Sequence, residues 1–132
     1  MSRSKEIKKL DKVFSQYVRK FHEDKDGLCT CITCNVKKPA KAMHAGHFMS
    51  RGCYSTRWLH EPDEGMVNVS PQCPRCNLYD SNQNYKYGLA LDAKYGKGTA
   101  EKIYNLSKQT SKYSIVDIVA MRKNYEKLLS EL

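Results

Sequence analysis

Apolar residues recur at helical spacing over the first part of the chain. Between residues 4 and 22 they fall three or four positions apart, and Lys and Arg fill most of the opposite side. The pattern predicts one amphipathic helix with an apolar side and a basic side. Its apolar residues are Ile7, Leu10, Val13, Phe14, Tyr17, Val18 and Phe21.

The helical pattern disappears in the middle of the chain and returns towards the C-terminus. Residues 23–68 are rich in Gly, Pro, Cys and short polar runs, which predict turns, a knuckle and short strands. Further on, Tyr87, Leu91 and Tyr95 recur every four residues and are followed by Gly96. Because glycine is favoured just past a helix end, this stretch predicts a helix that ends there.

Two more helices are predicted at the C-terminal end. The first begins at Thr99 and places Ile103, Tyr104 and Leu106 along its length. The second begins at Ser114, where Ser-x-x-Asp is a variant of the capping box. The apolar residues of this last helix are Ile115, Ile118, Val119, Tyr125, Leu128, Leu129 and Leu132. Such a run could pack on a partner or on a second copy of the chain.

These patterns divide the 132 residues into three segments. Residues 1–22 form the basic helix, residues 23–98 form an irregular core, and residues 99–132 form a helical extension. The fold class is therefore predicted to be α+β, with short strands in the middle and helices on both flanks.

The net charge of the chain limits the kinds of partner that we expect it to bind. The formal net charge is +9 with a pI near 9.3, which favours a polyanion and most commonly a nucleic acid. Residues 1–22 carry seven Lys or Arg against two acidic residues, so more than half of the excess lies there. This basic side is either a solvated helix surface or a DNA contact. The candidates for DNA contact are Lys8, Lys9, Lys12, Arg19 and Lys20.

The sequence also predicts the cellular compartment of the protein. No apolar run approaches the roughly 20 residues needed to span a bilayer, and the N-terminus lacks the apolar region of a signal peptide. We therefore expect a cytoplasmic protein with no membrane partner. In that reducing compartment, the six cysteines are more readily metal ligands than disulfides.

Two Cys-x-x-Cys pairs carry the strongest signal in the chain. Cys31 and Cys34 form one pair, and Cys73 and Cys76 form the other. Each pair can place two thiolates at adjacent corners of a tetrahedron around one Zn²⁺ ion. The spacing predicts a structural four-cysteine zinc site.

The two remaining cysteines are assigned no role in that site. Cys29 is one residue away from Cys31, which is a poor spacing for a knuckle, so we expect a partly buried thiol or a solvent-facing neighbour. Cys53 has no predicted function.

The long insert between the two pairs contains three of the four histidines, His44, His47 and His60. A histidine on a short strand, an asparagine in a following turn, and a histidine or asparagine at the head of a helix are the parts of a ββα-metal nuclease site. A neutral imidazole can activate water for attack on a phosphodiester. An asparagine can hold that imidazole by its other ring nitrogen, and a ligand on the helix can hold a divalent ion.

The motifs CITC, AGHF, SRG, TRW and QCPRCN, with the later Tyr/Leu/Tyr-Gly helix, resemble the NinG/Rap family of phage recombination proteins. That family lies within the HNH endonuclease superfamily, also called treble-clef or His-Me finger nucleases. The resemblance covers residues 10 to 104. It implies a zinc-stapled ββα-metal core and a metal-dependent DNA endonuclease that cuts branched DNA, such as D-loops or Holliday-type junctions. The chain would then act in the host bacterial cytoplasm.

The resemblance implies a role for three residues. His47 matches the first His of the HNH pattern and would be the general base. Asn68 matches the central Asn and would orient His47. Asn77 matches the third position, as in junction-cutting relatives of the endonuclease VII type, and would ligate the catalytic ion.

One position departs from the pattern. Many members have Asp before the first His as a second metal ligand, but this chain has Gly46. His44 is the first candidate to replace it, because period-two alternation places it on the same strand face. His60, Glu61 and Asp63 are alternatives. Oxygen ligands would suit Mg²⁺ or Mn²⁺, and an imidazole would favour a transition metal.

Arg51, Arg57 and Arg75 are predicted to contact phosphate near the site, because a guanidinium can bind a phosphate with two parallel hydrogen bonds. Trp58, the only tryptophan, is expected in the core rather than as a stacking platform. The main alternative to a nuclease is a non-catalytic zinc module that binds nucleic acid with the same basic surface. A third alternative is an adaptor that associates through its terminal helix.

Overall fold

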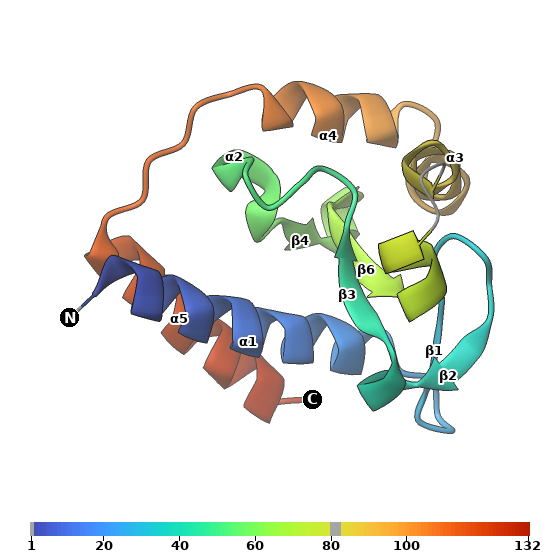
Figure 1. Cartoon of the computed structure of the whole chain (residues 1–132), viewed down its shortest axis with the longest axis horizontal. Helices are drawn as coiled ribbons and strands as arrows, with labels where there is room; N and C mark the ends of the chain where they lie inside the picture. The colour runs from blue at the N-terminus through green and yellow to red at the C-terminus, as the bar shows by residue number, and fades with distance from the viewer. Residues whose placement is uncertain (1, 80–82) are drawn as a thin grey trace.

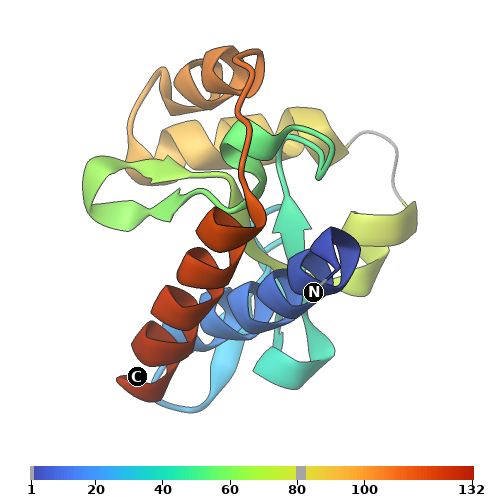
Figure 2. The same cartoon turned by 90° about the vertical axis from the view of Figure 1, so that its left-hand side faces the viewer.

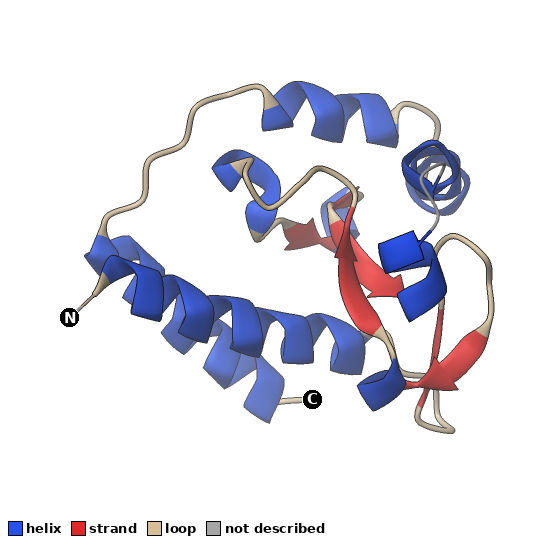
Figure 3. Cartoon of the chain, viewed as in Figure 1, coloured by secondary structure: helices blue, strands red, loops and turns tan. Residues whose placement is uncertain are grey.

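The computed structural model describes residues 2–79 and 83–132. The predicted α+β class is confirmed, because short strands lie at the centre and helices surround them (Figure 1, Figure 3). The helices are α1 (Arg3–Phe21), α2 (Tyr54–Arg57), α3 (Gln83–Tyr95), α4 (Thr99–Ser107) and α5 (Ile115–Ser130), with short helical turns η1 (Ala40–Ala42), η2 (Pro62–Glu64) and η3 (Arg75–Tyr79). The strands are β1 (Leu28–Thr30), β2 (Lys37–Pro39), β3 (His44–His47), β4 (His60–Glu61), β5 (Met66–Val67) and β6 (Val69–Gln72).

The predicted N-terminal helix is confirmed as α1, and it packs along α5. Figures 1 and 2 show the two helices side by side across one face of the molecule. Leu10 and Val18 of α1 are fully buried, and the ring of Phe14 lies 4.9 Å from that of Tyr125 on α5. The first and last segments of the chain therefore share one hydrophobic core, which also receives Trp58 and Val69 from the middle. The expectation that Trp58 lies in the core is confirmed.

Helix α5 begins where the sequence predicts. The Ser114 hydroxyl accepts a hydrogen bond from the backbone of Asp117, and the Asp117 carboxylate accepts one from the backbone of Ser114, so the capping box is complete. Ile118 and Tyr125 are buried against α1. Much of the apolar side considered for dimerisation is thus covered within the chain.

The strands form three antiparallel pairs, β1 with β2, β3 with β6, and β4 with β5. The β3–β6 pair carries the site, with Gly46 opposite Ser70 and His44 opposite Gln72. All four residues of β6 are buried. Helix α1 packs on this pair, and α3 is tied to it by the Tyr87 hydroxyl, which donates to the Gly46 carbonyl at 2.7 Å. The pair is therefore held between two helices.

A second small core joins α3 and α4. It consists of Phe48, Tyr87, Leu91 and Ile103, all buried. Helix α3 ends at Tyr95, and Gly96 follows with a left-handed φ of 121°, a conformation that glycine adopts without steric cost. Both predicted helices of this region are confirmed. Among the described residues, no helix has the length and apolar character needed to cross a membrane.

The half-buried His22 and the buried His60 form a pair where the end of α1 meets β4. Their Nε2 atoms lie 3.0 Å apart, and the rings of Tyr17 and Phe21 pack on His60. Burial lowers the pKa of His22 to about 3 and that of His60 to about 4, and the nearby positive charge of Lys94 acts in the same direction. Both rings are neutral at pH 7, and a neutral pair can form this hydrogen bond because one ring donates and the other accepts.

We expect this pair to make the fold sensitive to mild acid. A histidine whose pKa is lower in the folded state contributes stability above its unfolded pKa of about 6.5, and that contribution is lost as the pH falls below it. For His60 alone, the free energy of unfolding should fall by about 2 kcal/mol between pH 7 and pH 5. Urea unfolding of zinc-loaded protein at several pH values measures this change in the free energy of unfolding. His60→Phe should lose less stability than wild type over this range, while the control Tyr17→Phe should keep the wild-type pH dependence.

Candidate metal centre and active site

Four cysteine sulfurs gather at the end of β6. Cys31 and Cys34 follow β1, and Cys73 and Cys76 lie at the junction of β6 with η3. Their Sγ atoms all lie within 4.8 Å of one another. The Cys34 and Cys73 sulfurs are 3.7 Å apart, close to the edge of about 3.8 Å of a tetrahedron with zinc–sulfur bonds of about 2.3 Å. The predicted cluster is confirmed, and it could hold a zinc ion.

The electrostatics of the cluster favour a bound cation. Burial raises the pKa of Cys31, but hydrogen bonds from Thr33 and from the Cys73 backbone outweigh it and lower the pKa to about 6. Burial raises the pKa of Cys76 to about 12, and the neighbouring sulfurs add to the effect. Four thiolates in one place repel one another, so they ionise together only around a positive ion.

The other two cysteines lie outside the cluster of ligand sulfurs. Cys29, expected to be partly buried or solvent-facing, is instead fully buried, and its thiol donates to the Arg19 carbonyl at 3.1 Å. It is a packing residue that joins β1 to α1. Cys53 is half-buried beside Ser50.

His47 is the last residue of β3, and one nitrogen of its ring is engaged in a hydrogen bond. Its Nε2 lies 2.9 Å from the backbone carbonyl of Arg57, so Nε2 carries the proton and Nδ1 is left as the basic atom. Burial lowers the pKa of His47 and outweighs the hydrogen bond to the Arg57 carbonyl, which raises it; the positive charge of Arg51 also lowers the pKa, and the negative charge of Asp11 raises it. The imidazole is therefore neutral at pH 7 and can accept a proton.

The side chain of Asn68 bonds backbone groups rather than the His47 ring, which corrects our expectation of a direct hydrogen bond. Its side chain accepts from the Met49 backbone at 2.7 Å and donates to the carbonyls of Met49 and Thr56, at 3.1 and 2.9 Å. Asn68 is fully buried, and its amide closes both ends of the loop between β3 and α2. Because that loop leads to Arg57, Asn68 positions His47 through the carbonyl of Arg57.

His47 and Asn77 face the same space. Both line a cleft of about 340 Å³ between α1 and β3, called the α1 cleft, which is also bordered by Asp11, Phe14, Ser15, Ala45 and Arg51. Both also line a second cleft of about 190 Å³, called the amide cleft, together with Gln72, Cys76, Gln83, Asn84 and Tyr87. Asn77 lies in the π-helical turn η3, a geometry often found at functional sites. His47 and Asn77 thus line the same two clefts.

His44 lies beside Asn77, but its contact is not the one we expected. The Asn77 amide nitrogen is 2.8 Å from His44 Nδ1. An amide nitrogen only donates, so Nδ1 accepts and cannot serve as a metal ligand at the same time. His44 is placed to orient the amide of Asn77.

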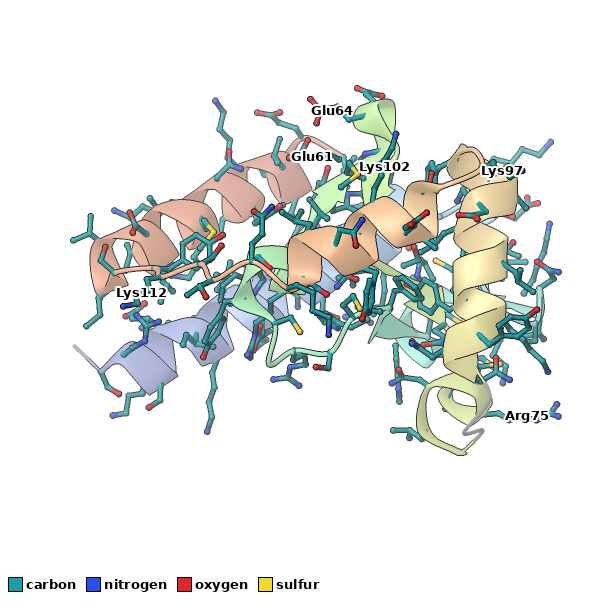
Figure 4. The ribbon with its side chains drawn as sticks, turned by 90° about the horizontal axis from the view of Figure 1, so that it is seen from above. Glu61, Glu64, Arg75, Lys97, Lys102 and Lys112 are labelled. Atoms are coloured by element: carbon teal, nitrogen blue, oxygen red, sulfur yellow. The ribbon has the colours of Figure 1, made fainter. Side chains whose placement is uncertain are left out.

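The alternative ligands His60, Glu61 and Asp63 lie elsewhere. His60 is buried in the pair with His22. Glu61 ends β4 and Asp63 lies in η2. Figure 4 shows Glu61 and Glu64 on the opposite side of the molecule from Arg75, which precedes Asn77 by two residues. His60, Glu61 and Asp63 are not among the described residues that line the two clefts of Asn77.

The three predicted phosphate contacts have different surroundings. Arg57 is buried and donates to both Asp11 carboxylate oxygens, at 3.2 and 2.6 Å, and to the Arg51 carbonyl at 2.8 Å. This corrects our expectation, because its guanidinium is used inside the molecule. Arg51 is exposed and borders the α1 cleft, although it also pairs with Asp11 at 3.1 Å. Arg75 extends from η3 away from the body of the molecule (Figure 4).

The basic residues of α1 fall on two sides of the helix. Lys8 is exposed and shares a helical face with Asp11 and Ser15, which line the α1 cleft, whereas the exposed Lys12 lies beside Lys9 in the groove that α1 forms with α5. Lys9 pairs with Glu6 on the side that meets α5. Lys20 is exposed, and Arg19 is tied to the backbone of Ser15 and Ala40.

Sequence reasoning missed two residues that border these clefts. Asp11 binds Arg57, Arg51 and the Trp58 indole, and so ties α1 to the loop that holds His47. The sequence feature that could have identified Asp11 is its position, an acidic residue at the edge of the apolar stripe of a basic helix. Gln72 had no signal, because only pairing of β3 with β6 brings it beside Gly46.

Comparison with known proteins identifies a family. A family model described as the bacteriophage lambda NinG protein matches residues 1–132. A search of curated proteins gave no match. A search of solved structures gave none either.

We predict that Cys34 is required for metal binding. Because Cys34 is exposed, Cys34→Ser removes a ligand with little loss of packing. Wild type should contain one zinc per chain by elemental analysis, and the variant should lose it and unfold at a lower temperature. Cys53→Ser is the matched control and should keep both zinc and stability. Equal zinc in Cys34→Ser and wild type would rule out the four-cysteine site.

Proposed function

Since the chain belongs to the family of the bacteriophage lambda NinG protein, we propose that it is a metal-dependent DNA endonuclease of the HNH type. The family suggests a role related to phage recombination. Within that role, the proposed substrate is branched DNA, such as a D-loop or a Holliday-type junction. The reaction is hydrolysis of a phosphodiester bond.

The arrangement of His47 carries the proposal. Its Nε2 is held by a backbone carbonyl, its pKa is lowered by burial, and it shares two clefts with Asn77. A neutral imidazole with one nitrogen held and the other free suits a general base. A histidine that served only packing would not need to share open clefts with a polar residue.

The residues of this chain would divide the reaction as follows. His47 Nδ1 takes a proton from water as the water oxygen attacks the phosphorus atom, and the bond from phosphorus to the 3′ oxygen breaks. A divalent ion, when bound, stabilises the negative charge on the phosphoryl and leaving oxygens. Asn77 would be the first ligand for that ion through its side-chain oxygen. Arg51, at the border of the α1 cleft, contacts a neighbouring phosphate.

A series of hydrogen bonds supports His47. Asn68 closes the loop, Asp11 holds the guanidinium of Arg57, and the carbonyl of Arg57 holds His47. Such support keeps the base in its reactive orientation, because a catalytic group must be held within a fraction of an ångström. The four-cysteine cluster would fix η3, and with it Asn77, while taking no part in the chemistry.

DNA would approach along α1. The exposed Lys8 lies on the helix face that borders the α1 cleft, Lys12 lies beside Lys9 on the neighbouring side of α1, and Lys20 lies just over two turns beyond Lys12. Phosphate contacts from lysines give affinity without sequence preference. This fits a substrate recognised by its branched shape.

The direct test is cleavage of labelled DNA by zinc-loaded protein. Linear duplex, flap and four-way junction substrates are incubated with Mg²⁺, Mn²⁺ or EDTA. Wild type should cut branched DNA only with a divalent ion, and His47→Ala should lose cleavage by roughly a hundredfold or more, since general-base catalysis contributes about 10² to 10⁴. DNA binding, measured by gel shift, should persist in the variant.

Two outcomes contradict the proposal. If His47→Ala cuts as well as wild type, the reaction does not occur at this site. If neither protein cuts any substrate while both bind, the chain is a zinc-stabilised nucleic-acid-binding module.

The pH dependence of cleavage offers an independent prediction. A general base works when it is deprotonated, and the pKa of His47 is lowered, so cleavage should remain near its maximum below the ordinary histidine pKa of about 6.5. Arg51→Ala removes a positive charge that lowers this pKa, and should move the acid limb to higher pH. The control Lys97→Ala should leave the acid limb at its wild-type pH. An acid limb above pH 7 in wild type would contradict the role of His47.

A further inference from the structure

Position 46 is a glycine because a glutamine fills the space beside it. A Cβ atom built on Gly46 would lie 2.0 Å from Oε1 and 2.7 Å from Cβ of Gln72. Both distances are far below ordinary contact, so no larger residue fits while Gln72 is there. The φ angle of Gly46 is not in the left-handed region, so space rather than backbone conformation requires glycine.

Gln72 is itself buried and oriented. Only 3% of its surface is exposed. Its Nε2 donates to the Thr33 hydroxyl at 3.4 Å, which turns Oε1 towards Gly46. Thr33 lies between two zinc-ligand cysteines, Cys31 and Cys34, and Gln72 directly precedes a third, Cys73. The cysteine cluster thus fixes the positions of both Thr33 and Gln72, the two residues that form this hydrogen bond.

Two side-chain amides are among the groups that line the amide cleft. Gln72 and Asn77 both line it, together with His47. Each amide nitrogen has an acceptor, Thr33 for Gln72 and His44 for Asn77. The two side-chain oxygens are therefore the atoms of these amides that can ligate a cation.

We propose that Oε1 of Gln72 is the second ligand of a divalent cation in the amide cleft, with Asn77 as the first. Gln72 thereby replaces the carboxylate that the glycine at position 46 cannot supply. The presence of the cation site does not require that the chain cut DNA, although its catalytic use rests on the proposed function. Two amide oxygens and water are hard ligands, which suit Mg²⁺ or Mn²⁺.

The neutral ligand pair has a consequence for affinity. Without a carboxylate, the protein supplies no negative charge from these two ligands, and Mg²⁺ sites commonly rely on substrate phosphates. Binding to the free protein is therefore weak, and a single added charge at position 72 should strengthen it.

The test measures Mn²⁺ binding to the zinc-loaded full chain by the relaxation of water protons, a readout that needs no DNA and no activity. Gln72→Leu should weaken Mn²⁺ binding at least about tenfold, because a hydrophobic side chain of similar size replaces the ligand. Gln72→Glu should strengthen it by roughly tenfold, because a charged oxygen replaces a neutral one. Gln109→Glu adds the same charge at an exposed position of the chain and should leave Mn²⁺ binding unchanged.

A pair of exchange variants tests the geometry more sharply. Gln72→Gly should lose Mn²⁺ binding as Gln72→Leu does. Adding Gly46→Asp to Gln72→Gly should restore it, because the new carboxylate enters the space that the glutamine leaves. Zinc content and thermal unfolding, measured for every variant, separate loss of the ligand from loss of the fold.

The outcomes distinguish this inference from the proposed function. Unchanged Mn²⁺ binding in both Gln72→Leu and Gln72→Glu overturns the inference, even if His47→Ala abolishes cleavage. Absence of Mn²⁺ binding by wild type also overturns it. Conversely, Mn²⁺ binding that follows residue 72, and returns in the exchange variant, supports the inference even if no DNA is cut.

Discussion

The arrangement of this molecule depends on the convergence of four cysteine sulfurs. The strands around them have only two to four residues, and pairs of this length have little stability alone. The cluster joins the end of the β1–β2 hairpin to the start of η3, across 38 intervening residues. A metal ion bound there would supply the folding free energy that the short strands cannot. It would also fix Asn77, Gln72 and Thr33 relative to one another.

A second set of constraints holds His47 from the other side. Asn68 and Asp11 are polar groups in or near the core, and each satisfies several hydrogen bonds. A buried amide that lost those partners would cost about 1 to 3 kcal/mol, so the loop from Met49 to Thr56 has one favourable arrangement. That loop delivers the carbonyl of Arg57 to His47. The histidine is thus oriented by a backbone carbonyl whose position depends on the side chains of Asn68 and Asp11.

Local patterns in the sequence predicted much of the fold. Helices α1, α3, α4 and α5 follow from apolar spacing and from end signals such as Gly96 and the Ser114–Asp117 capping box, since these depend on neighbours within a few residues. The four cysteines followed from the knuckle spacing. His47 and Asn77 were found by motif, and they share two clefts.

The remaining features depend on contacts between segments far apart in the chain. The sequence by itself determined the four longer helices and which cysteines cluster, because local spacing and ligand chemistry carry that information, and its resemblance to a family singled out His47 and Asn77. Only the tertiary structure decided that Arg57 binds Asp11, that Asn68 closes a loop, that His44 binds Asn77, and that Gln72 fills the space at Gly46. Each of these depends on strand register or helix packing, which places a side chain beside a partner that no short-range pattern specifies.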